Sequence, residues 1–126
     1  MSYVYSAAAK VAANTSFREL LDSESGNAKM LLVNSGGTTL ATITFDDPCG
    51  TVNGTTGQLT LTVHQNEANA PETGTIDEAR IVDGADNVHL TIPVKQGTAP
   101  DPGWVVVSST SVIAGGAINA QSVTIG

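Results

Sequence analysis

Apolar and polar residues alternate most clearly between residues 76 and 95. From Val88 to Lys95 every second residue is apolar, which is the two-residue period of a strand with one buried face. The turn formers Asp83 to Asn87 precede this stretch, and the run Ala79 to Val82 supplies a returning strand. The pattern therefore predicts an antiparallel β-hairpin whose alternate residues, beginning with Val88, point inward.

Further strands are predicted by the same reasoning. Gln58 to His64 and Thr39 to Phe45 alternate, and within residues 29–34 the run 30–33 is apolar on both faces, as in a central strand or one covered by a helix. The turn formers between Asp46 and Gly57 are either one long loop or two tight turns around Thr51 and Val52. Shorter strands are expected at 104–107, 112–113 and 117–125, the last with a bulge near 119–122.

The N-terminal region has a helical composition. Residues 6–14 are alanine-rich, and Ser16 to Glu19 matches a capping box, so a helix is expected to start near Ser16 and to end by Gly26-Asn27. Either one helix runs through Asn14 to Ser16 or two pieces meet there. The expected fold is mainly β, an antiparallel β-sandwich or jelly roll over residues 24–126, preceded by an N-terminal arm or short helix over residues 1–23.

Composition and charge limit the classes of function. The chain has 126 residues, enough for one domain, and its core must be built from aliphatic residues because only 4% of residues are aromatic. The net charge is -7 and the five cations are scattered singly, which argues against nucleic acid as a ligand. A single cysteine forms no internal disulfide, and no segment resembles a secretory signal or a membrane span.

The residues that could carry chemistry have ordinary structural interpretations. His64 and His89 lie on the polar faces of predicted strands, where a lone histidine is usually solvated, and two histidines without a third ligand make a poor zinc site. We interpret Cys49 as a small buried hydrophobic residue. We interpret the aspartates at 46–47 and 83–86 as turn residues in preference to calcium ligands. The carboxylates at 67–78 fall in a solvated loop. We therefore expect no catalytic, cofactor or metal site, and no enzyme.

Large side chains at two places are candidates for partner contacts. Tyr3, Val4 and Tyr5 lie at a terminus beyond a sandwich that is complete without them, so we expect this arm to contact a partner. Trp104 follows the rigid Pro- and Gly-rich stretch 96–103. It either packs on its own domain, which is the commoner outcome, or serves as a second contact anchor.

The order of these parts along the chain resembles that of a known family. An Ala-rich start and the segment Phe17 to Asp22 are followed by several Thr-rich strands and a Gly-containing C-terminal strand. The chain resembles the jelly-roll cement, or decoration, proteins of tailed bacteriophages. The resemblance implies a homodimer or homotrimer that is made in the host cytoplasm and binds the major capsid protein on the capsid exterior. It transfers no functional residues. The segments that carry it are 17–22, 40–45, 79–83, 113–118 and 123–125.

The chain's own chemistry is compatible with that role. An acidic protein is repelled by packaged DNA, which favours the outer surface, and open edge strands with a terminal arm can bridge subunits. The alternatives are a tail, collar or spike component of the virion, and a carbohydrate-binding β-sandwich module. The last of these normally presents aromatic platforms to sugars, and Trp104 is the only tryptophan of this chain.

Overall fold

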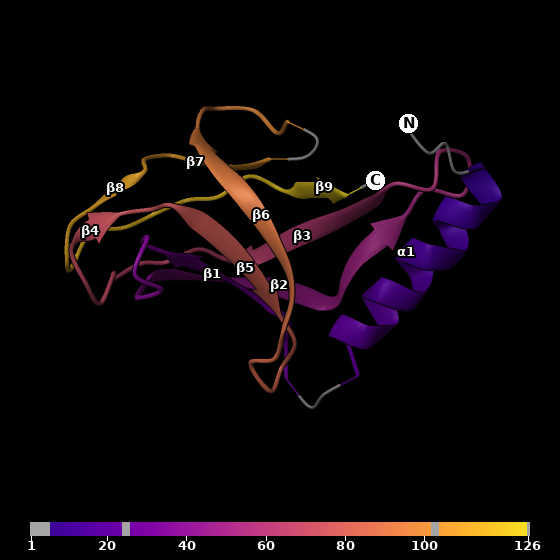
Figure 1. The fold of residues 1–126 in the computed structure, drawn as a ribbon, viewed down its shortest axis with the longest axis horizontal. Coiled ribbons are helices and arrows are strands. Elements are labelled where there is room, and N and C mark those ends of the chain that lie inside the picture. Colours follow the sequence, from indigo (N-terminus) through magenta and orange to yellow (C-terminus); the bar gives the residue numbers. More distant parts are fainter. Residues whose placement is uncertain (1–5, 24–25, 102–103, 126) are drawn as a thin grey trace.

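The computed structural model describes residues 6–23, 26–101 and 104–125, and these form one helix and nine strands (Figure 1). The predicted architecture, mainly β with one short N-terminal helix, is confirmed. The one strand that the sequence did not predict is the two-residue β4, in a region expected to be loop. In chain order the elements are α1 (Ala7–Leu21), β1 (Lys29–Val33), β2 (Thr39–Val52), β3 (Leu59–Gln65), β4 (Gly74–Thr75), β5 (Glu78–Val82), β6 (Val88–Gln96), β7 (Val105–Val107), β8 (Ser111–Val112) and β9 (Val123–Ile125).

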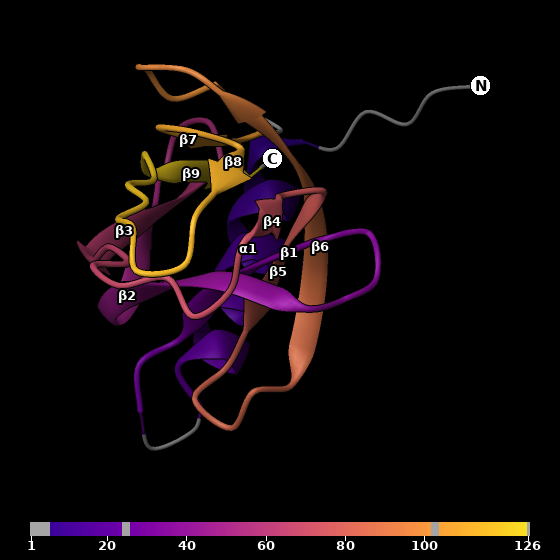
Figure 2. The same cartoon turned by 90° about the vertical axis from the view of Figure 1, so that its left-hand side faces the viewer.

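Seven of the strands form one large sheet in the order β7-β6-β5-β1-β2-β3-β9, and β4 pairs with β8 in a small second sheet. The large sheet curls until its two ends approach each other, because Val107 of β7 bridges to Ala120, just ahead of β9 (Figure 2). The sheet is therefore nearly closed. The expectation of a wholly antiparallel sheet is wrong at one place, since β6 and β7 run parallel. A parallel neighbour needs a crossover in place of a tight turn, and residues 97–104 supply that connection.

The predicted hairpin is confirmed as β5 and β6, which pair in antiparallel register from Glu78 opposite Pro93 to Val82 opposite Val88. The register shifts between Ile81 and Val82, so one additional residue of β6 is accommodated near the turn. This irregularity changes the alternation at the start of β6. Val88 is consequently half-exposed, and the prediction that it points inward is wrong.

The core lies on the concave side of the sheet and is aliphatic, as the composition requires. β1 is central, paired with β2 and β5, and Met30 and Leu32 on it are fully buried. β2 continues to Val52, through the residues 46–50 that were expected to form a turn. The register with β3 jumps between Phe45 and Gly50, so residues 46–49 bulge out of an otherwise continuous strand. One tight turn, at 53–57, then connects β2 to β3.

The helix α1 is continuous, which settles the choice between one helix and two. It begins after Ser6, whose Oγ accepts a hydrogen bond from the backbone N–H of Ala9 at 3.1 Å. The predicted start at Ser16 is wrong because the alanine-rich segment before it already forms a helix with its own N-cap. The helix lies beside β2 and β3 at one end of the sheet (Figure 1). It is attached there by the buried Leu21 and by Asn14, whose Nδ2 donates to the carbonyl of Gly57 at 2.6 Å.

Candidate functional site

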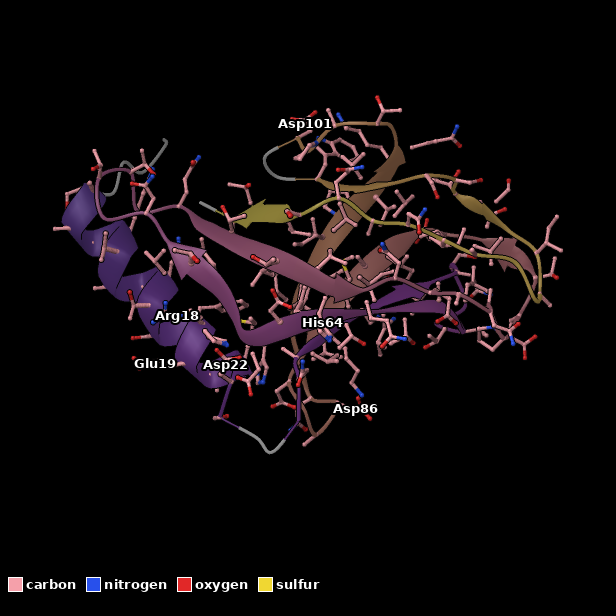
Figure 3. All side chains as sticks on the ribbon, turned by 180° about the vertical axis from the view of Figure 1, so that it is seen from behind. Arg18, Glu19, Asp22, His64, Asp86 and Asp101 are labelled. Carbon is pink, nitrogen blue, oxygen red and sulfur yellow. The ribbon has the colours of Figure 1, made fainter. Side chains whose placement is uncertain are left out.

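Trp104 directly precedes β7, where the connection from β6 enters that strand. Its side chain is 39% exposed, and the Nζ atom of Lys95 lies 5.2 Å from the centroid of its ring. Lys95 is also paired with the carboxylate of Asp101, which lies in the connecting loop (Figure 3). The backbone N–H of Trp104 donates to the carbonyl of Asp101 at 3.0 Å. The ring therefore contacts its own domain and still reaches solvent, and its role as a contact anchor stays a prediction.

The other predicted contact residues, Tyr3, Val4 and Tyr5, lie outside the described residues. Their role as a partner-binding arm stays a prediction. The middle of the helix that follows them lies close to β9, because Asn14 Nδ2 lies 3.4 Å from the carbonyl oxygen of Ile125.

Asp83 is a buried carboxylate in the turn of the β5–β6 hairpin. It accepts hydrogen bonds from the backbone N–H groups of Ala85 at 2.9 Å and Asn87 at 3.0 Å, and from Nδ2 of Asn87 at 3.2 Å. His89 Nε2 lies 2.9 Å from its Oδ2. The hydrogen bond with His89, together with these donors, lowers the pKa of Asp83 from 3.8 to about 2. The carboxylate is occupied in holding the turn, which supports the turn-residue interpretation over a calcium site.

The prediction that His89 is simply solvated is wrong. Its ring is largely buried and pairs with Asp83 across the turn. The alternation of apolar and polar residues in β6 does not indicate this contact. The position of a histidine just after an Asp-rich turn was an available signal. Since its position is fixed by Asp83, His89 belongs to the framework of the hairpin.

His64 forms a separate pair with Asp46, with 2.9 Å between Nδ1 and Oδ1, and both side chains are well exposed. An exposed pair of this kind contributes little to stability. β3, which carries His64, is separated from β6 by β2, β1 and β5 in the sheet. The two histidines therefore do not lie on neighbouring strands.

Cys49 is buried at the end of the β2 bulge, as the sequence predicts for a small hydrophobe. Its backbone N–H donates to both carboxylate oxygens of Asp22, at 3.1 and 3.2 Å, which ties the end of α1 to β2. Burial, reinforced by the nearby Asp22 charge, raises the pKa of the Cys49 thiol to about 12. The thiol is thus a poor nucleophile. Figure 3 shows Asp22 together with Arg18 and Glu19 at this end of the helix.

Among residues 6–23, 26–101 and 104–125, no three His, Cys, Asp or Glu side chains are grouped as metal ligands. Within the same residues no helix is long and apolar enough to cross a bilayer.

Ile113 is a surface residue whose exposure was not predicted from the sequence. It was expected to belong to a short extended piece, but it lies just after β8 and its side chain is 72% exposed. It is the most exposed large hydrophobic side chain among the described residues, ahead of Val88, Leu20 and Trp104. The turn formers Ala114-Gly115-Gly116 after it were the available signal, since residues at the ends of turns are commonly exposed.

No family model, no curated protein and no solved structure matches the chain. The resemblance to capsid decoration proteins stays a prediction from the sequence pattern. The functional conclusion therefore depends on the chain's own surface, above all on the corner formed by Lys95, Asp101 and Trp104, which we call the Trp104 corner.

Proposed function

We propose that this protein is a non-enzymatic structural protein of a bacteriophage virion, which binds the outside of the capsid and holds neighbouring major capsid protein subunits together. It would be made in the host cytoplasm and act on the capsid as a homodimer or homotrimer. The observation that supports this proposal most directly is the Trp104 corner, a partly exposed tryptophan whose ring is contacted by Lys95.

Tryptophan is among the residues that dominate the energy of protein–protein interfaces. A flexible side chain loses conformational entropy when a partner immobilises it, and this loss reduces affinity. The contact of Lys95 with the ring, and the pairing of Lys95 with Asp101, restrict Trp104 before any partner is bound. A fixed aromatic ring at a corner of a β framework is thus suited to insertion between partner side chains.

The electrostatics favour the outer surface of a capsid. The net charge of -7 disfavours contact with packaged DNA, which is itself a dense array of negative charge. A capsid presents the same binding site many times, so an oligomer of this protein gains avidity from contacts that are individually weak. Neither catalysis nor a cofactor is needed for such a role, because the bound protein acts mechanically.

The proposal is tested with purified protein and intact capsids that lack it. We expect saturable co-sedimentation and a higher temperature of capsid disruption after binding. Trp104→Ala should weaken binding by roughly 30-fold, the equivalent of a hot spot worth about 2 kcal/mol. Thr98→Ala, an exposed residue in the same loop, is the control and should bind like the wild type.

Failure of the wild-type protein to bind or stabilise intact capsids would refute the proposal. Binding to tails, or ring-shaped oligomers in solution, would favour the tail, collar or spike alternative. A glycan array tests the carbohydrate-binding alternative. Hits that disappear with Trp104→Ala would indicate a carbohydrate-binding module.

A further inference from the structure

The end of the molecule opposite α1 is formed by two segments, residues 66–76 and 110–120, which run antiparallel to each other (Figure 1). β4 and β8 are the regular part of this pairing. Beyond them the backbones of Glu67 and Ile118 exchange two hydrogen bonds, at 3.2 and 2.9 Å, and the N–H of Ile76 donates to the carbonyl of Thr110 at 2.8 Å. Both segments are therefore ordered along most of their length, although little of them is assigned to strands.

The turn at 113–116, which we call the Ile113 turn, is part of this pairing. The carbonyl of Ile113 accepts from the N–H of Gly116 at 2.8 Å, and Gly115 has a φ of 87°, the pattern of a type II turn with glycine in its third position. The backbone of Ala70 bonds to Gly115 at 2.7 Å and to Gly116 at 2.8 Å. The N–H of Ala114 donates to Oγ1 of Thr73 at 2.9 Å. The turn is thus held on the side that faces the 66–76 segment.

Ile113 projects from this ordered backbone with 72% of its surface in water. Single exposed hydrophobic residues are common on proteins and usually need no explanation. Ile113 differs because Val112 before it is paired in β8 and Ala114 after it is bonded to Thr73, so its backbone is fixed on both sides. A partner that covered Ile113 would remove apolar surface from water without first ordering the loop.

The charges around the turn indicate what kind of partner would fit. Glu72, next to Thr73, is exposed, and Glu67 and Asp77 lie in or beside the same segment, so this end is acidic. A second copy of the chain would bring more negative charge. Of its five cations, three are already paired with its own carboxylates, as Lys29–Asp86, Arg80–Glu78 and Lys95–Asp101. Charge complementarity therefore favours a different protein, with lysine or arginine near an apolar pocket.

We propose that the Ile113 turn is a second docking point, separate from the Trp104 corner, that inserts Ile113 into an apolar pocket with a basic rim on the major capsid protein. This inference rests on the proposed function. Trp104 directly precedes β7 and Ile113 directly follows β8, so the two side chains stand at opposite ends of the 105–112 segment, and each would contact a different capsid subunit. Two separated contacts are what holding neighbouring subunits together requires.

The test compares Ile113→Ser with Val88→Ser, which removes a similar aliphatic side chain from the hairpin end of the molecule. Val88 is also about half-exposed, so neither substitution opens a cavity in the core. Thermal unfolding should show that both variants fold like the wild type. We expect Ile113→Ser to weaken binding to capsids that lack the protein by at least about tenfold, while Val88→Ser leaves it unchanged. Added salt should weaken wild-type binding, because the proposed rim of the pocket is basic.

The outcomes separate this inference from the proposed function. If the wild-type protein binds capsids and Ile113→Ser binds equally well, the inference is overturned while the function stands. If Ile113→Ser changes the oligomeric state in solution and leaves capsid affinity unchanged, the turn contacts a second copy, which also overturns it. If the wild-type protein does not bind capsids, the proposed function itself fails.

Discussion

Leu21 and Leu20 are adjacent leucines in the last turn of α1 that have opposite environments, and they provide a sharp test of how the helix is attached. Leu21 is fully buried in the same core cluster as residues of β1, β2 and β3, whereas Leu20 is 45% exposed. Leu21→Ala should lower the free energy of unfolding by about 2–5 kcal/mol, the usual range for leucine truncation in a core. Leu20→Ala should change it by less than about 0.5 kcal/mol.

The comparison isolates packing because both substitutions change helix propensity by the same amount. For a domain of this size, a loss of about 3 kcal/mol corresponds to a fall in Tm of roughly 10 °C. Urea denaturation followed by circular dichroism measures the free energy. Fluorescence of Trp104 is a second probe, since it reports from the β6–β7 connection. Equal stabilities of the two variants would refute the reasoning, because they would mean that α1 does not contribute to the core.

Three further predictions concern the turn carboxylate, the thiol and a close approach between backbones. Because the folded-state pKa of Asp83 lies below its ordinary value of 3.8, the stability it provides is complete above that pH and is lost as the pH falls to about 2. The difference in unfolding free energy between the wild type and Asp83→Asn should shrink over that range, and a constant difference would contradict the assignment. Cys49, with a pKa raised to about 12, should resist a thiol reagent at about pH 8 until urea unfolds the protein; rapid labelling of the folded protein would show that it is accessible. Gly57→Ala should cost more than about 1 kcal/mol, because Gly57 has a φ of 77° and an added Cβ would lie 2.3 Å from Cβ of Lys10. Gly54→Ala is the matched control, since nothing lies within 4 Å of its added Cβ, and similar losses for both would remove the steric explanation.

The strands whose alternation is local were predictable from the sequence. β3, β5 and β6 appear close to their expected bounds, because each side chain's preference for the core or for water is expressed residue by residue. The start of the helix was not predictable in this way. Ser16 and Glu19 form a valid local cap signal, but the helix propensity of the preceding alanines and the N-cap at Ser6 extend the helix past it.

The two candidate contact surfaces were also predictable only in part. Trp104 could be selected from the sequence, because a tryptophan after a Pro-rich loop is unusual in so aromatic-poor a chain. The contact of its ring with Lys95 could not be predicted, since Lys95 lies nine residues earlier, on β6. The exposure of Ile113 depends on residues 66–76, which are about forty positions distant and carry no pattern that indicates their pairing with 110–120.

The mainly β class, the aliphatic core, the acidic net charge and the β5–β6 hairpin follow from the sequence alone, because composition and short-range periodicity act within a few residues. The sequence does not show that β7 lies parallel to β6, that the sheet curls until Val107 meets Ala120, or that Asp83 and His89 pair. These features depend on contacts between segments that are distant along the chain or lie across a turn. Their geometry is set by how the whole sheet closes around its core, which no local pattern specifies.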